Sequence, residues 1–208
     1  MTSTPPNTPS VVERTRAIAA GAPVVAVHFL GRTAAFVLGE EAVVLVAEKG
    51  DERRLALHGG GILSAAADGA SVVTGGDDGK VLATDAKGES RPIATDLKRR
   101  WIDQVAAGPD GAVAWSAGKQ AFAQTGNGEP RSIEVQSTVG GLAFAPKGLR
   151  LAVAHYGGAT LWFPNAQANP EMLVWKGSHL DTAFSPDGKV LVTSMQDWTL
   201  HGWCLMDG

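Results

Sequence analysis

The residues best suited to acid–base or metal chemistry in this sequence are its five histidines, namely His28, His58, His155, His179 and His201. No two of them stand four residues apart, the spacing at which one helix presents two imidazoles to a zinc ion. The single cysteine, Cys204, leaves no cysteine pair for a structural zinc site and no internal disulfide. The sequence therefore predicts no metal and no cofactor, and its cysteine content favours the reducing cytoplasm.

The densest positive charge is the run from Lys98 to Arg100, directly followed by Trp101. Such a run beside an aromatic ring could bind a nucleic-acid backbone or an acidic partner segment. It could equally be a solvated loop or, because apolar residues recur at positions 93, 97, 101 and 105, one side of a short amphipathic helix. With 18 Lys and Arg against 21 Asp and Glu, the net charge is −3, so we expect no nucleic acid as the main partner.

The elements that must position these residues are indicated by the spacing of glycine and proline. Twenty-six glycines and 11 prolines are spread evenly along the 208 residues and separate short segments rich in Val, Ala and Leu. This pattern is typical of many short strands joined by turns. A content of 44% hydrophobic and 19% charged residues is that of a globular domain, and no apolar run is long enough to span a membrane as a helix.

A turn motif recurs along the chain. Its copies are HFLG at 28–31, SAAADG at 64–69, AAGPDG at 106–111, AFAPKG at 143–148 and AFSPDG at 183–188. The last glycines of successive copies are separated by 38, 42, 37 and 40 residues. A period near 40 is typical of repeats that each form a small four-stranded sheet.

Each copy continues with segments in the same order. An apolar segment follows the turn, then a second tight turn such as DDG at 77–79, a further short strand, and a more polar strand such as RSIEV at 131–135. Four short strands joined by tight turns form a meander, whose faces are buried only when neighbouring sheets pack on them. The sequence therefore predicts an all-β fold, a β-propeller of four-stranded antiparallel blades with about five repeats. In this frame residues 91–95 are a strand, followed by a loop to 102 and another strand.

The last repeat carries the residues by which a family can be named. His179 precedes the AFSPDG turn, Thr193 ends the next apolar segment, Asp197 lies in the second turn and Trp203 closes the strand beyond it. This order resembles the WD-repeat propeller family. The resemblance implies that these four side chains form a hydrogen-bonded structural network within the blade.

The other copies match the family pattern less completely. The second copy has His58, Thr74 and Asp78 at the matching places, with Thr84 where the family has Trp. In the last copy Cys204 stands where the family has the Asp after Trp, and the third copy lacks both His and Asp. The resemblance covers residues 15–208 and is specific for fold rather than for function.

The repeat frame divides the chain as follows. Residues 1–14 are a flexible, polar and proline-rich N-terminus, and 15–208 are propeller blades, with repeats at 20–57, 58–95, 100–135, 137–175 and 178–208. The last copy ends after its third strand. Either TRAIA at 15–19 completes it and closes a five-bladed ring, or the chain holds the first blades of a longer, seven-bladed ring. We favour the second alternative.

Propeller enzymes such as lactonases hold a metal with carboxylates and histidines at the mouth of the central channel. Only Asp103 and Asp181 carry charge at comparable positions here, and two acidic groups are too few for such a site. We therefore expect no catalytic residues and no enzyme. The alternatives are a propeller hydrolase or lactonase with a channel metal, and a fragment whose missing blades carry the functional site.

We expect a cytoplasmic, non-catalytic scaffold that binds a protein or peptide partner and no membrane. Four residues fall on turns at the side of the ring where propellers usually bind partners: Trp101, His155, Tyr156 and Trp198. Trp198 stands where the family usually has glycine, so its ring should project from the surface, and exposed aromatic rings of this kind are enriched at binding hot spots.

Overall fold

The computed structural model of the chain describes residues 10–39 and 42–205. Within these ranges the first three sheets are separate antiparallel meanders of four strands each. The strands of the first sheet are β1 (Val24–Leu30), β2 (Thr33–Leu38), β3 (Ala42–Val46) and β4 (Glu52–Ala56). Those of the second are β5 (Ile62–Ala67), β6 (Ser71–Gly76), β7 (Lys80–Asp85) and β8 (Ser90–Thr95). Those of the third are β9 (Gln104–Ala107), β10 (Val113–Ala117), β11 (Gln120–Gln124) and β12 (Arg131–Glu134).

The remaining strands belong to two blades that share one strand. They are β13 (Gly141–Phe144), β14 (Leu151–Trp162), β15 (Glu171–Phe184), β16 (Val190–Met195) and β17 (Leu200–Cys204). The first half of β14 pairs with β13 and its second half with β15, and the chain turns between them at Gly157 and Gly158, which have positive φ angles. The first half of β15 pairs with β14 and its second half with β16. The fourth strand of one blade thus continues into the first strand of the next.

The predicted all-β fold of four-stranded antiparallel blades is confirmed. The glycines that end the five copies of the turn motif, Gly31, Gly69, Gly111, Gly148 and Gly188, all have positive φ angles. An L-residue with a side chain adopts this conformation only at a cost, which explains why glycine recurs there. Between Thr95, where β8 ends, and Gln104, where β9 begins, the chain forms a loop rather than the alternative amphipathic helix.

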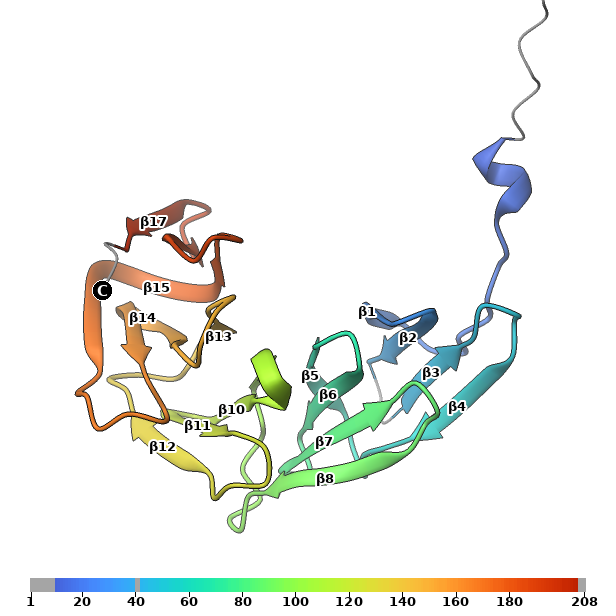
Figure 1. Cartoon of the computed structure of the whole chain (residues 1–208), viewed down its shortest axis with the longest axis horizontal. Helices are drawn as coiled ribbons and strands as arrows, with labels where there is room; N and C mark the ends of the chain where they lie inside the picture. Colours follow the sequence, from blue (N-terminus) through green and yellow to red (C-terminus); the bar gives the residue numbers. More distant parts are fainter. Residues whose placement is uncertain (1–9, 40–41, 206–208) are drawn as a thin grey trace, which may run out of the picture.

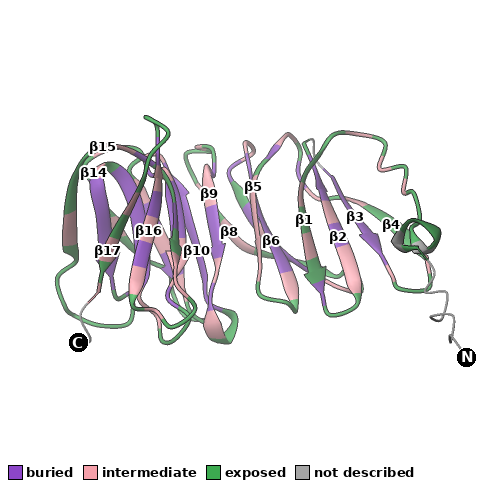
Figure 2. Ribbon diagram, turned by 90° about the horizontal axis from the view of Figure 1, so that it is seen from above, coloured by how far each residue is buried: buried purple, intermediate pink, exposed green. Residues whose placement is uncertain are grey.

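The core lies between the sheets. One cluster of buried residues joins the first and second sheets through Val37, Val43 and Val72, and another joins the second and third through Val81, Ile102 and Trp115. Equivalent clusters join the third sheet to β13 and β14, and β14 to β16 and β17. Figure 2 shows the buried residues along the strands and the exposed ones mostly at the turns. Each sheet therefore depends on its neighbours for its stability.

Together the sheets form an open arc (Figure 1). The segment at 15–19 lies beside the first sheet, where Ile18 packs on Leu38 and Val44. It does not reach β17 at the opposite end of the arc. The alternative in which residues 15–19 complete the last blade of a closed five-bladed ring is therefore wrong for this structure.

The predicted flexible N-terminus lies largely outside the described residues, which begin at Ser10. From Val11 to Arg14 the chain forms one turn of 3-10 helix. Ser10 and Glu13 cap this turn. The Glu13 carboxylate accepts a hydrogen bond from Ser10 N, and the Ser10 hydroxyl accepts one from Val12 N.

Candidate functional site

In a four-stranded meander, the turn between the second and third strands lies at the same end as the start of the first strand and the end of the fourth. We call this end of the sheets the upper face. It carries the turns at 77–79, 117–119, 155–158 and 196–199 and the loops between sheets. Backbone hydrogen bonds join these segments, as from Asp77 N to Gly61 O and from Asp96 N to Gly79 O. All the partner-binding residues predicted from the sequence belong to this face.

In the second sheet a buried histidine connects the upper turn with the strands below it. His58 Nε2 lies 2.9 Å from Thr74 Oγ1, and its Nδ1 lies 3.0 Å from Asp78 Oδ1. The Asp78 carboxylate also accepts hydrogen bonds from the backbone N–H groups of Gly59 and Lys80. Burial opposes the charged form of Asp78, but these hydrogen bonds outweigh it and hold the pKa of Asp78 below its usual value.

In the last blade the corresponding histidine has a different set of partners. His179 Nδ1 lies 2.7 Å from Thr193 Oγ1, and its Nε2 lies 3.1 Å from the carbonyl oxygen of Trp175. Asp197 instead accepts hydrogen bonds from the backbone N–H and the hydroxyl of Thr199 in its own turn. The expectation that Asp197 bonds His179 is therefore wrong, because the second ring nitrogen of His179 is hydrogen-bonded to the Trp175 carbonyl oxygen instead.

The predicted fourth member of that network, Trp203, lies beside the histidine as an aromatic neighbour. Its ring centroid is 5.6 Å from that of His179 and 4.5 Å from that of His201. His201 in turn stacks on Trp175 at 3.9 Å. Four rings from β15 and β17 thus form one contiguous cluster.

His155 is a correction to the predicted partner-binding set. Its side chain is fully buried, with Nε2 2.9 Å from Thr160 Oγ1 and Nδ1 2.9 Å from the carbonyl oxygen of Tyr156. Burial lowers the pKa of His155 and outweighs the hydrogen bond to the Tyr156 carbonyl oxygen, which acts in the opposite direction. A side chain enclosed in this way cannot contact a partner, so the predicted binding role of His155 is wrong.

The three aromatic residues predicted to bind a partner are exposed on the upper face. Trp101 is 63% exposed, Tyr156 62% and Trp198 99%. Tyr156 pairs in register with Ser178, whose carbonyl oxygen accepts a hydrogen bond from Gln196 N, two residues before Trp198. Tyr156 and Trp198 therefore lie on adjoining turns, whereas Trp101 lies in the loop that leads into the third sheet.

The backbone of Trp198 is in the left-handed region, with a φ angle of 66°. Glycine adopts this conformation without cost, and tryptophan does not. The turn therefore places a large aromatic ring in solvent at the expense of backbone strain.

Among the exposed apolar side chains near this end of the sheets, the sequence did not single out Trp175 and Leu97 as binding residues. Trp175 is partly exposed at the end of the β14-paired half of β15, and Leu97 is almost fully exposed in the loop before Trp101. Trp175 lies within β15, where exposure does not alternate regularly along the strand, so the period-two pattern that marks a buried face gave no signal for it.

The basic run beside Trp101 is partly committed to internal contacts. Arg100 forms an ion pair with Asp96 at 2.6 Å and donates a hydrogen bond to Gln120 Oε1. The hydrogen bonds from Arg100 hold the pKa of Asp96 below its usual value. Lys98 and Arg99 remain exposed, so this loop presents two cations rather than three to a partner.

The inner wall of the arc is lined by the first strands of the sheets and encloses a hollow of about 560 Å³. His28 and Asp181 are its ionisable lining residues. Asp103, the other channel candidate, accepts a hydrogen bond from Gly118 N. Across residues 10–39 and 42–205, no group of three or more His, Cys, Asp or Glu side chains could hold a metal ion.

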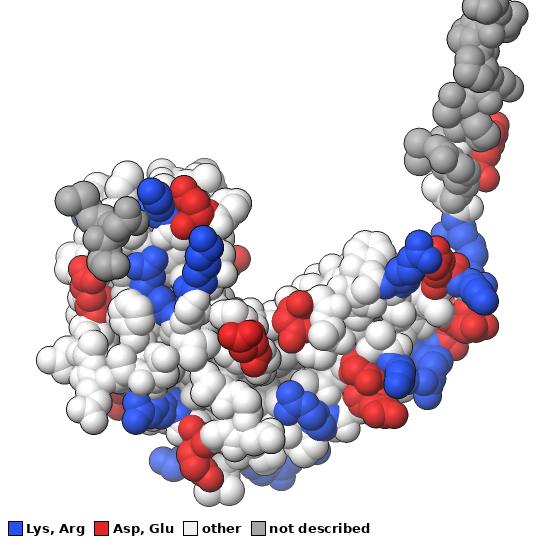
Figure 3. Space-filling model, viewed as in Figure 1, with Lys and Arg blue, Asp and Glu red and all other residues white. Residues whose placement is uncertain are grey.

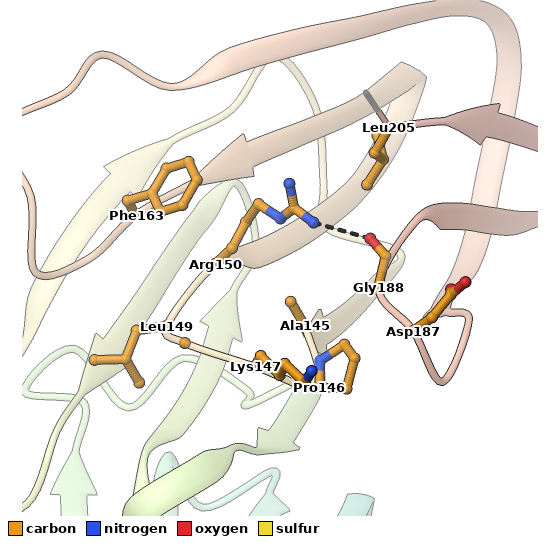
Figure 4. Close-up of a pocket in the computed structure, with 10 residues that line it drawn as sticks. Ala145, Pro146, Lys147, Leu149, Arg150, Phe163, Asp187, Gly188 and Leu205 are labelled. Carbon is orange, nitrogen blue, oxygen red and sulfur yellow. Dashed lines mark hydrogen bonds between the residues drawn. The ribbon is translucent and has the colours of Figure 1, made fainter. Parts of the chain in front are cut away.

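A pocket of about 460 Å³ opens at the other end of the sheets, the lower face, between the turns at 145–150 and 185–189. Arg150 points across it and donates a hydrogen bond to the carbonyl oxygen of Gly188, while Phe163 and Leu205 lie on either side (Figure 4). The Arg150 guanidinium also lies over the ring of Phe184. These contacts join the last two blades, so we assign the pocket a packing role.

Charge is mixed over the face drawn in Figure 3, where acidic and basic residues are interspersed among uncharged ones. Of the helical segments that the structure describes, none is long and apolar enough to cross a membrane.

Comparison of the sequence with models of protein families and with curated proteins finds no match. Comparison of the structure with solved structures finds similar folds. A chain of the mitotic checkpoint complex superimposes with a TM-score of 0.72 and 21% identity, over 88% of this chain and 64% of that chain. The β-propeller domain of Myceliophteria thermophila Cps50 (Swd1) superimposes with a TM-score of 0.69 and 14% identity, over 88% of this chain and 66% of that one.

The present chain therefore spans less than two thirds of each of these propellers. At these identities the likeness concerns the fold, which is the β-propeller that the resemblance to WD-repeat proteins implies.

Proposed function

We propose that this protein is a non-catalytic scaffold that binds a protein or peptide partner through its upper face. The observation that carries the proposal is the placement of Trp198, almost wholly exposed and held by a strained turn, on the turn that adjoins Tyr156. Strained residues persist where the surrounding structure enforces them and cluster at functional sites. Large aromatic residues are enriched among binding hot spots.

The fold supports the same proposal. A ring or arc of rigid sheets presents turns from several blades on one face. One of the two similar solved structures is a chain of a multiprotein complex, the mitotic checkpoint complex. A partner that spans the turns of the last two blades would contact Tyr156 and Trp198 together. We propose the cytoplasm as the compartment, because the one cysteine, Cys204, is exposed and unpaired among the described residues.

The experiment is affinity capture from native lysate with the intact protein and with a Tyr156→Ala/Trp198→Ala variant. The matched control is Phe163→Ala, which removes a partly exposed aromatic ring from the lower face. We expect a partner that is retained by the intact protein and by Phe163→Ala and is lost with the double variant. A partner retained equally by all three proteins would contradict the proposed face.

The catalytic alternative has its own test. Metal analysis of the purified protein should find no stoichiometric divalent cation, since the inner wall offers His28 and Asp181 on separate sheets rather than a converging ligand set. Stoichiometric zinc or calcium would favour a propeller hydrolase instead.

A further inference from the structure

The last strand, β17, has a free edge. It pairs with β16, and no strand within the described residues pairs with its other side. Leu205 N donates a hydrogen bond to Lys189 O across this pair of strands. Because backbone groups of successive residues point to opposite sides of a strand, the N–H and C=O groups of Leu200 and Gly202 point away from β16. Leu200 is also 74% exposed. An exposed edge with an apolar side chain is a template for another strand.

The other blades show what kind of strand fills this position. Each fourth strand carries a large aliphatic residue that packs into the core shared with the next sheet, namely Leu55, Ile93, Ile133 and Leu173. In the first three blades an arginine stands two residues before it, at Arg53, Arg91 and Arg131. The fourth strands of the first three blades thus share the pattern Arg-x-Leu or Arg-x-Ile.

In the first and third blades the arginine of this pattern bonds the neighbouring blade. Arg53 of the first sheet donates a hydrogen bond to the carbonyl oxygen of Lys87 in the second. Arg131 of the third sheet donates to the carbonyl oxygens of Pro164 and Ala166, in the loop after β14. In these two blades the pattern therefore combines a fourth-strand position with a hydrogen bond to the next blade.

The same pattern occurs once more, outside the sheets. Residues 15–19 read TRAIA, with Arg16 two residues before Ile18. Arg16 precedes Arg53 by 37 residues, and Arg53 precedes Arg91 by 38, so TRAIA stands one repeat before the fourth strand of the first sheet. By sequence, it is the fourth strand of a blade that would precede the first sheet.

In the structure this segment forms no strand. Arg16 pairs with Glu52 at 3.5 Å, and both side chains are about half exposed, which makes the contact weak. The arc separates the segment from β17 of its own chain, and the cores between successive sheets fix that curvature. A second copy of the chain has no such constraint.

We propose that residues 15–19 of one copy add to the free edge of β17 of a second copy and lie there as a fourth strand of its last blade. By the registers of Arg53 with Leu45 and of Arg131 with Ala123, Arg16 would lie opposite Gly202 and Ile18 opposite Leu200. Exchange of an identical segment between copies is a common route to self-association.

The apolar faces at the two ends of the arc support this pairing. On the first sheet Val25, Val27 and Phe29 are exposed on the face that turns away from the second sheet. On the last blade Leu200 is exposed on the face that turns away from β14. When the TRAIA segment of one copy joins β17 of another, these two faces come next to each other, as successive blades do within one arc.

The test uses the full chain and two substitutions at one residue. Gly202→Pro removes an N–H that points away from β16, so the strand can still pair with β16 but cannot accept a new neighbour. Gly202→Ala is the matched control, because a Cβ there meets only ordinary contacts of 3.7 Å or more. Ile18→Asp removes the aliphatic residue of the incoming strand. Circular dichroism checks that all variants keep their strand content.

Two readouts decide the outcome. Light scattering over a range of concentrations gives the mass, and hydrogen exchange gives the protection of the Leu200 and Gly202 amides. We expect the intact chain and Gly202→Ala to reach at least the mass of two chains, with these amides protected, and Gly202→Pro and Ile18→Asp to stay at the mass of one chain. Unprotected amides in a single-chain particle would overturn the proposal, and protected amides in a single-chain particle would overturn it in favour of closure within one chain.

Discussion

His58 and His179 occupy the same place in two repeats, yet different groups hold their imidazole rings. Each ring bonds a threonine on the second strand of its blade, Thr74 or Thr193. The other ring nitrogen of His58 meets the Asp78 carboxylate, and that of His179 meets a backbone carbonyl oxygen. The same position in the two repeats thus supports two different local networks, and only that of His58 ties the upper turn to the strands.

The Asp78 network leads to a prediction about stability. Asp78→Ala leaves the buried His58 ring and the Gly59 and Lys80 amides without their acceptor, so we expect a loss of about 2 to 3 kcal/mol in the free energy of unfolding. Asp197→Ala is the control, since that carboxylate accepts its hydrogen bonds from groups of its own exposed turn, such as Thr199. Urea unfolding measures both. Equal losses in the two variants would show that the His58 contact carries no special weight.

The strained turn at Trp198 predicts a trade of stability against binding. Trp198→Gly should raise the free energy of unfolding by about 0.5 to 1 kcal/mol, because glycine adopts the positive φ angle without steric cost. Trp198→Ala keeps the strain and should leave stability nearly unchanged. Both should lose the partner captured by the intact protein. Urea unfolding and affinity capture test the two effects separately, and a destabilised Trp198→Gly variant would contradict the account of strain.

Buried His155 predicts a loss of stability in mild acid. Its pKa is lowered by burial in the folded state, so the unfolded chain binds more protons once the pH falls below the ordinary histidine value of about 6.5. Stability should therefore fall as the pH drops through that value, with a slope of up to about 1.4 kcal/mol per pH unit from this group. His155→Gln should reduce the slope in urea titrations at several pH values. An unchanged slope would assign the acid sensitivity to other groups, such as His28 and His201, whose pKa values burial also lowers.

Among the elements, the loops between blades differ in how tightly they are packed. A Cβ built on Gly140 would lie 2.1 Å from the carbonyl oxygen of His179, so the start of β13 touches the backbone of β15. By contrast, a Cβ on Gly59, in the loop between the first two sheets, meets nothing within 4 Å. A Cβ on Gly141, the residue after Gly140, would lie 2.6 Å from Asp181 Cα, so the close approach of the last two blades depends on two adjacent residues without side chains.

This contrast predicts different responses to the same substitution. Gly140→Ala forces two backbone segments apart and should lower the free energy of unfolding by about 3 kcal/mol or more. Gly59→Ala, in an equivalent loop, should have little effect. Thermal or urea unfolding of the two variants checks the prediction, and similar stabilities would mean that the blades separate more readily than their packing indicates.

At the scale of the whole molecule, the turns and their period could be predicted from the sequence, because turn chemistry is local. A glycine with a positive φ angle must recur wherever the first strand turns into the second, and counting those glycines counts the blades. Contacts between distant segments could not be predicted in this way. The burial of His155, the Trp175 carbonyl that replaces Asp197 beside His179, and the position of residues 15–19 all depend on how separate parts of the chain meet.

The strand β15 has a mechanical consequence. Because one continuous strand serves as the fourth strand of one blade and the first strand of the next, tension applied to the C-terminal blade passes directly along the backbone into the blade before it. The earlier blades are joined by loops that can yield one at a time. We expect force spectroscopy to extend the last two blades in a single step, while the first three sheets give way in separate steps.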